Sequence, residues 1–260
     1  MSFAGVSLSI VNAFCERLFR VQLQARSIVR PASPEQYQNE PVLDDALRRL
    51  QNHKIEIASL IDVGAAEGFW SKAFAERFPD RHHLLVDANE AHRTNLERLC
   101  QENQRWQFAL TAVGGATGEA YFDGSDPLVG NLSTQPWNDN YHRCPVTTLD
   151  DLLENRSVPG PFMIKLDTHG VEIPILNGAT KTLKETSVIV IEAYNFTFGE
   201  PAVPFWDLCR HLLELGFRPV DVFDLLYREV DSAFWQFDLL FVRSDLPLFQ
   251  DNRFFIAGRH

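Results

Sequence analysis

The chain has 260 residues and a net charge of −11, from 24 basic and 35 acidic side chains. Because proteins hold nucleic-acid phosphates mainly with lysine and arginine, this balance argues against a nucleic-acid substrate. A hydrophobic share of 45% is enough for the core of a globular protein. No stretch reaches the about 18–20 apolar residues that span a bilayer. Four widely spaced cysteines and the lack of secretory features lead us to expect a cytoplasmic protein.

Residues 6–30 are predicted to form an amphipathic helix, because apolar side chains recur every three to four positions and most arginines fall outside that stripe. Three prolines within residues 31–41 then indicate a linker. We therefore predict an N-terminal helical extension with its linker over residues 1–56 and a second domain over 57–260. The helix is expected to pack on that domain or on a second subunit of a homodimer. A position on a membrane surface is the alternative for a basic amphipathic helix.

A regular alternation of strands and helices follows a short helix at 42–51. Strands are expected at 59–63, 83–86, 106–110, 162–166 and 188–191, with helices at 67–78, 90–101, 149–154, 171–183 and 205–215. Residues 114–145 are rich in Gly, Asp, Asn and Pro, so we expect an irregular insertion that covers the ligand. Two strand-like runs, 218–223 and 236–242, end the pattern. It predicts a doubly wound α/β fold with a mostly parallel sheet and an antiparallel pair at one edge.

The first strand ends in a glycine-containing turn, Asp62-Val63-Gly64-Ala65-Ala66-Glu67-Gly68. Glycine permits a left-handed backbone and the close approach of a ligand, and ligands bind beyond the carboxyl ends of parallel strands. The spacing is not the G-x-G-x-x-G of dinucleotide sites. A carboxylate such as Asp62 does not suit a pyrophosphate but suits a cationic group, such as the amino group of a methionine moiety. The turn therefore favours a nucleoside-sulfonium ligand that contacts Asp62, Gly64, Ala65 and Gly68.

The second strand also ends in an acid, in the run Asp87-Ala88-Asn89. A carboxylate at this position can accept hydrogen bonds from both ribose hydroxyls, as in many nucleotide sites. A structural cap without a ligand is the alternative for Asp87. The turn after the third strand, which contains Ala112, is placed to flank an adenine ring with its backbone.

The fourth core strand carries an unusual charge, Lys165, followed by Asp167 and His169. Residues two apart on a strand share a face, so Lys165 and Asp167 are expected to pair. Asp167 and His169 are candidates to take a proton from an attacking hydroxyl. A purely structural Lys165–Asp167 pair and a helix-capping His169 are the alternatives. The fifth strand ends in Glu192, and Mg²⁺ held by Asp167, Glu192 and Asn195 is a weaker alternative.

An acceptor pocket is expected between the 114–145 segment and the loop after the fifth strand. That loop and the helix behind it carry aromatic side chains of the kind that stack on sugar faces or apolar rings, namely Tyr194, Phe196, Phe198 and Trp206. An ordinary position in the core is the alternative for each of them.

Several of these segments together resemble the FkbM family of methyltransferases. The matching pieces are Ile61–Ala65 with Gly68, Val86–Asn89, 146–152, the block 164–172, the run 176–179 and Glu192. The resemblance implies a seven-stranded Rossmann-like sheet, S-adenosylmethionine as the methyl donor, and a hydroxyl on a natural product or saccharide as the acceptor. His169 stands where the family usually has glutamate. A non-catalytic binding module and a nicotinamide-dependent oxidoreductase are the competing functions.

Overall fold

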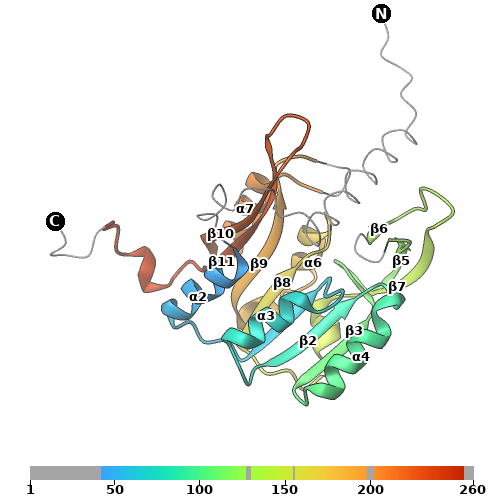
Figure 1. Ribbon diagram of the computed structural model, residues 1–260, viewed down its shortest axis with the longest axis horizontal. Helices are drawn as coiled ribbons and strands as arrows, with labels where there is room; N and C mark the ends of the chain where they lie inside the picture. The colour runs from blue at the N-terminus through green and yellow to red at the C-terminus, as the bar shows by residue number, and fades with distance from the viewer. Residues whose placement is uncertain (1–41, 127–129, 155, 198–201, 255–260) are drawn as a thin grey trace, which may run out of the picture.

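The computed structural model describes residues 42–126, 130–154, 156–197 and 202–254 (Figure 1). The helix predicted at 6–30, and with it the homodimer contact, lies outside these residues. None of the helices in these ranges is long and apolar enough to cross a membrane.

The centre of the fold is a seven-stranded sheet in the order β10-β11-β9-β8-β1-β2-β3. Its strands are β1 (Ser59–Val63), β2 (His82–Asp87), β3 (Trp106–Leu110), β8 (Phe162–Leu166), β9 (Thr186–Tyr194), β10 (Phe217–Tyr227) and β11 (Phe234–Arg243). The five strands from β3 to β9 are parallel, and β11 runs antiparallel to both β9 and β10. The Rossmann-like sheet with an antiparallel edge is thus confirmed.

Helices cover both faces of this sheet, because its inner strands are apolar on both sides. The helices are α2 (Leu43–His53), α3 (Phe69–Arg77), α4 (Arg93–Glu102), α5 (Leu149–Glu154), α6 (Glu172–Asn177) and α7 (Phe205–Glu214). On one face, α2 and α3 pack over side chains such as Leu60 and Met163, and α4 packs over Leu85. On the other, α5, α6 and α7 pack over their neighbours Ile61 and Ile164. Because adjacent residues of a strand point to opposite faces of the sheet, they pack into separate hydrophobic cores, one on each face.

The helix α2 shows how this packing is stabilised. Ala46, Leu47 and Leu50 share one helical face and are buried against the sheet. Burial of each leucine contributes about 2 kcal/mol relative to exposure. In Figure 1, α2 and α3 lie in front of the sheet.

Residues 112–147 form a second sheet rather than the irregular insertion that their composition predicts. Its order is β4-β7-β5-β6, from β4 (Ala112–Val113), β5 (Gly118–Asp123), β6 (Asn131–Ser133) and β7 (His142–Thr147). The apolar side chains Phe122, Cys144 and Val146 are buried between these strands. The strands are short and pair with partners between 8 and 34 residues away, so the one alternating piece at 119–122 does not reveal the sheet.

The single helix expected at 171–183 is also broken. The helix α6 ends at Asn177, and a 3-10 turn, η2 (Thr182–Glu185), follows. Gly178 lies at the break, where a Cβ atom would come 2.6 Å from the backbone oxygen of Gly114. Close contact between two backbones therefore explains both the glycine and the end of the helix.

Candidate functional site

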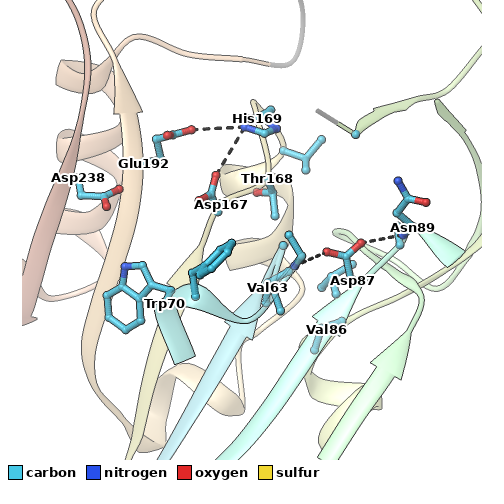
Figure 2. Close-up of a pocket in the computed structure, with 18 of the residues that line it drawn as sticks. Val63, Trp70, Val86, Asp87, Asn89, Asp167, Thr168, His169, Glu192 and Asp238 are labelled. Carbon is cyan, nitrogen blue, oxygen red and sulfur yellow. Dashed lines mark hydrogen bonds and ion pairs between the residues drawn. The ribbon is translucent and has the colours of Figure 1, made fainter. Parts of the chain in front are cut away.

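A cavity of about 790 Å³ opens at the carboxyl ends of β1, β2, β8 and β9 (Figure 2). This is the edge at which ligands bind in open α/β sheets. One half is lined by the loop after β1, the end of β2, the residues before and within β4, and Phe122 and Leu132 of the second sheet. The other half is lined by Asp167 to His169, Glu192, the start of α3 and the β10–β11 hairpin.

The glycine-containing loop passes tightly between the neighbouring strands. Gly64 has φ +80°, and its N–H and that of Ala65 donate to the carbonyl of Val86. A Cβ atom on Gly64 would lie 2.1 Å from the carbonyl oxygen of Asp167. The loop therefore presents the backbone of Gly64, Ala65 and Ala66 directly to the cavity.

Gly68 has a different part in this structure. It precedes α3 with φ +70°, and a Cβ atom there would lie 2.6 Å from Leu99 of α4. The residue does not line the cavity, so its glycine allows two helices to pack closely. A direct contact of Gly68 with the ligand stays a prediction.

Asp87 ends β2 with both carboxylate oxygens already fixed. Oδ2 accepts a hydrogen bond of 2.7 Å from Ala66 N–H, and Oδ1 accepts one of 2.7 Å from Asn89 N–H (Figure 2). Burial raises the pKa of Asp87, and these two N–H groups lower it in part. Each oxygen keeps a second lone pair, so the carboxylate can still accept hydroxyl donors from a ligand. Ala88, Asn89 and Ala112 line the same part of the cavity.

Asp62 lies beneath the loop rather than in the cavity wall. Its carboxylate is buried and accepts a hydrogen bond of 2.6 Å from the Ser71 hydroxyl of α3. Burial raises the pKa of Asp62 to about 6, against the lowering effect of the Ser71 hydrogen bond and the Lys165 charge. Direct contact with a ligand's amino group stays a prediction, since the structure gives this carboxylate a protein partner.

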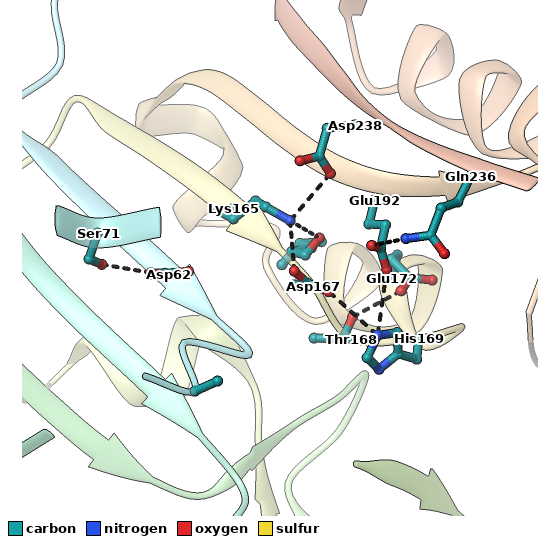
Figure 3. A network of polar contacts seen from close by, with 12 residues as sticks. Asp62, Ser71, Lys165, Asp167, Thr168, His169, Glu172, Glu192, Gln236 and Asp238 are labelled. Carbon is teal, nitrogen blue, oxygen red and sulfur yellow. Dashed lines mark hydrogen bonds and ion pairs between the residues drawn. The ribbon is translucent and has the colours of Figure 1, made fainter. Parts of the chain in front are cut away.

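Polar residues continue across four adjacent strands on the face covered by α2 and α3. Strand register pairs Asp62 with Lys165 and Glu192 with Asp238, and alternation turns all four to the same face. Figure 3 shows Lys165, Glu192 and Asp238 near the end of β8, whereas Asp62 lies to one side with its hydrogen bond to Ser71.

Lys165 lies at the centre of this group and is buried. Its Nζ lies 3.3 Å from Asp167 Oδ2 and 3.5 Å from Asp238 Oδ1. Burial lowers the pKa of Lys165, but the nearby carboxylates raise it more, with Asp167 and Asp238 the strongest. The residue therefore stays a cation at neutral pH and cannot act as a base.

His169 lies between two carboxylates. Its Nε2 is 3.5 Å from Asp167 Oδ1 and 3.5 Å from Glu192 Oε2 (Figure 3). Burial lowers the pKa of His169, but hydrogen bonding to Glu192 and the charges of Glu192, Asp167 and Glu172 raise it more, to about 9. An imidazolium is therefore the stable form at neutral pH. The interpretation of His169 as a simple helix cap is not supported, because Val171 is the N-cap of α6 and no side-chain cap hydrogen bond is present there.

Two residues of the site, Gln236 and Asp238 of β11, were not predicted from the sequence. Gln236 donates to Glu192, and Asp238 pairs with Lys165. Both line the cavity. A signal was present, because the two polar residues alternate within an otherwise apolar strand, as Lys165 does in β8.

Three of the four aromatic residues expected at the acceptor pocket do not line this cavity. Tyr194 is buried and donates to Glu192, Phe196 stacks on Trp235, and Trp206 is exposed on α7. None of the three lines the cavity, and Phe198 lies outside the described residues. The wall instead uses Phe69 and Trp70 of α3 with the aliphatic Val42, Leu43, Leu225 and Leu226.

These groups fit a nucleoside-sulfonium donor. Asp87, at the end of β2, retains lone pairs that can accept hydrogen bonds from ribose hydroxyls. The apolar Val113 suits a flat base, and the loop after β1 suits a slender chain. The excess of carboxylates beyond the loop suits a cationic ligand end.

One comparison with known proteins identifies the family. The profile of the Methyltransferase FkbM domain matches residues 62–219, more than half of the chain. Comparison with curated protein sequences gives no match.

Among solved structures, the Burkholderia thailandensis 1,6-didemethyltoxoflavin-N1-methyltransferase is similar over 94% of each chain, with 14% identity and a TM-score of 0.45. The Geobacter metallireducens precorrin-6y C5,15-methyltransferase is similar over 78% of this chain and 90% of its own, with 10% identity and a TM-score of 0.43. TrmK from M. capricolum is similar over 74% of this chain and 66% of its own, with 9% identity and a TM-score of 0.42.

The match of the family profile covers the glycine-containing loop, Asp87, the Lys165–His169 strand end and Glu192 in one continuous stretch. The chain belongs to the FkbM family of S-adenosylmethionine-dependent methyltransferases.

Proposed function

We propose that the protein transfers the methyl group of S-adenosylmethionine to a hydroxyl oxygen of a small natural product or saccharide. The observation that carries this proposal is the position of Asp167, His169 and Glu192 on the wall of the cavity that the donor loop also lines. Hydroxyl attack on carbon requires a group that accepts a proton, and this wall supplies carboxylates within hydrogen-bonding reach of the cavity.

The donor half is proposed to lie along the loop after β1. Asp87 binds the ribose hydroxyls, while Ala88, Asn89 and the backbone at Ala112 surround the base. The backbone of Gly64 and Ala65 holds the methionine end. In support, all six residues line the cavity, and Asp87 is fixed by the same loop.

The reacting end is proposed to lie at Asp167. The bound donor supplies a methyl carbon made electrophilic by the positive sulfur. Asp167 keeps 27% of its side chain exposed, more than its partners Lys165 and His169. Its carboxylate orients the acceptor hydroxyl and takes the hydroxyl proton as the oxygen attacks. Lys165 holds Asp167 in place through Oδ2, and the His169 imidazolium fixes Oδ1. Orientation of this kind supplies much of the rate in displacement reactions.

The acceptor's body is proposed to occupy the half of the cavity next to α2, α3 and the β10–β11 hairpin. Phe69 is 71% exposed at this rim, although it is a large apolar side chain. Exposed aromatic groups beside a cavity favour ring or sugar faces as ligands.

The first experiment is calorimetric titration with S-adenosylhomocysteine, with NAD as the control ligand. We expect binding of the thioether nucleoside and none of NAD. An acceptor screen that follows S-adenosylhomocysteine release then compares hydroxylated compounds with matched amines and with their deoxy analogues. Folded protein that does not bind the nucleoside would refute the proposed donor site. Donor binding without transfer to any hydroxyl would instead favour the non-catalytic module, and transfer to amines alone would refute the oxygen acceptor.

A further inference from the structure

We propose that Asp167, His169 and Glu192 together form a binding site for a divalent transition-metal cation. Binding of the cation stands on the geometry alone, and only its catalytic consequence rests on the proposed hydroxyl acceptor.

The three side chains offer one nitrogen and two oxygen donors in a compact arrangement. His169 Nε2 lies 3.5 Å from Asp167 Oδ1 and 3.5 Å from Glu192 Oε2, and all three atoms lie within 4.8 Å of one another. Ligands that bind one metal ion at about 2.0–2.2 Å lie about 3–4 Å from each other. Both contacts of the imidazole fall in this range. Small movements of the side chains would therefore bring all three donor atoms to binding distance of one ion.

Backbone and neighbouring side chains hold each donor in position. His169 has φ +53° in a loop that Glu172 ties down through Gly170 and Thr168. Glu192 accepts from the Tyr194 hydroxyl and the Gln236 amide. Such outer contacts orient the ligands in known metal sites.

The two carboxylate oxygens of Asp167 contact different residues. Lys165 contacts Oδ2 at 3.3 Å, while Oδ1 is directed toward His169. The lysine can therefore stay in place when a metal binds Oδ1.

The local charge also favours a cation. Within the described parts of the chain, four carboxylates, from Asp167, Glu172, Glu192 and Asp238, gather around Lys165 and His169. A bound cation takes the place of the imidazolium proton, which leaves to solvent, and adds one further positive charge. Since three protein ligands leave coordination positions facing the cavity, the site has the open form of catalytic rather than structural metal sites.

The donor set also indicates which metals fit. An imidazole nitrogen with two carboxylates suits Mn²⁺, Fe²⁺ or Zn²⁺, whereas Mg²⁺ and Ca²⁺ prefer oxygen ligands alone. At this position the cation would make a bound hydroxyl more acidic and so promote loss of its proton.

Titration of chelator-treated, full-length protein with Mn²⁺ tests the proposal, by calorimetry and by loss of the free-ion electron paramagnetic resonance signal. We expect one site per chain. Glu192→Gln and His169→Asn should each weaken Mn²⁺ binding at least about tenfold, or about 1.4 kcal/mol. Asparagine is chosen because it tolerates the left-handed backbone but is too short to replace Nε2. Asp238→Asn is the comparison for charge alone, since it removes a carboxylate that pairs with Lys165 but offers no ligand atom to the cation, and it should weaken Mn²⁺ binding clearly less than Glu192→Gln does.

Folded protein that binds no Mn²⁺ would overturn the proposal. Equal weakening by Asp238→Asn and Glu192→Gln would do the same, because it would indicate only a negative field. His169→Glu, which supplies a third carboxylate, should lower the preference for Zn²⁺ over Mg²⁺. Binding of S-adenosylhomocysteine, measured on the same samples, separates the two proposals: metal binding without nucleoside binding would refute the donor site and leave the metal site standing.

Discussion

The carboxylate of Asp87 accepts a hydrogen bond of 2.7 Å from the backbone N–H of Ala66, which joins the end of β2 to the loop after β1. The acid proposed to bind the ribose therefore also fixes the loop proposed to hold the rest of the donor. In the proposed donor site, this one contact would hold both halves in place before a ligand binds.

Substitution of Asp87 should weaken nucleoside binding strongly. Asp87→Ala removes the acceptors for the ribose and releases Ala66, so we expect S-adenosylhomocysteine affinity to fall about 10–100-fold, which matches the loss of one or two charged hydrogen bonds. Asp87→Asn keeps one carbonyl acceptor, so its affinity should lie between those of the native protein and Asp87→Ala. Calorimetry measures both. Glu90→Gln is the control, since Glu90 is exposed and pairs with Arg93; equal affinities for all four proteins would rule out the ribose contact.

Substitution of Gly64 should destabilise the fold as well as the site. A Cβ atom there would clash with the Asp167 carbonyl at 2.1 Å in a backbone with φ +80°. Relief of that clash must move β1 or β8, so we expect Gly64→Ala to lower the free energy of unfolding by about 2–4 kcal/mol. Urea titration followed by circular dichroism measures this.

Gly118→Ala provides the comparison for that experiment. A Cβ atom on Gly118 meets nothing within 4 Å, and the residue lies at the exposed start of β5. We expect a change below about 0.5 kcal/mol. Similar losses for the two variants would mean that the tight approach of the loop to Asp167 is not important for stability.

The sequence predicted the sheet well because apolar runs and glycine-containing turns are local signals. The same locality explains what it missed. Lys165 stood out as a charge within a buried strand, and its pair with Asp167 follows from strand alternation. Its second partner, Asp238, reaches it only because β11 inserts between β9 and β10, and strand order cannot be read from local periodicity. The short strands of the second sheet and the break at Gly178 likewise depend on contacts between distant segments.

The Lys165–Asp238 contact gives a test of this long-range pairing. Lys165→Met leaves Asp167 and Asp238 without their shared cation in a buried site, so we expect a loss of about 3–5 kcal/mol of stability. Asp238→Asn alone should cost less, because Asp167 still pairs with Lys165. The double variant should be more stable than the sum of the two single losses predicts, by about 1–2 kcal/mol. Additive losses would show that the two residues do not interact.

The buried Asp62 should make stability depend on pH in an unusual direction. Burial raises its pKa in the folded protein to about 6, above the ordinary value of 3.8, despite the Ser71 hydrogen bond and the Lys165 charge that lower it, while the charges of Asp167 and Asp87 raise it further. The folded state therefore holds this proton at pH values where the unfolded chain has lost it. The resulting stabilisation is complete below pH 3.8, declines between pH 3.8 and 6, and is absent above pH 6.

Asp62→Asn isolates this effect, because the amide does not titrate and its oxygen still accepts the Ser71 hydroxyl. At about 1.4 kcal/mol per pKa unit, the stability of the variant relative to the native protein should rise by about 3 kcal/mol from acidic to neutral pH. Urea unfolding of both proteins at several pH values across this range measures the difference. Ser71→Ala removes a hydrogen bond that lowers the pKa, so it should move the transition to higher pH. A constant difference between Asp62→Asn and the native protein at all pH values would show that Asp62 titrates alike in the folded and unfolded states.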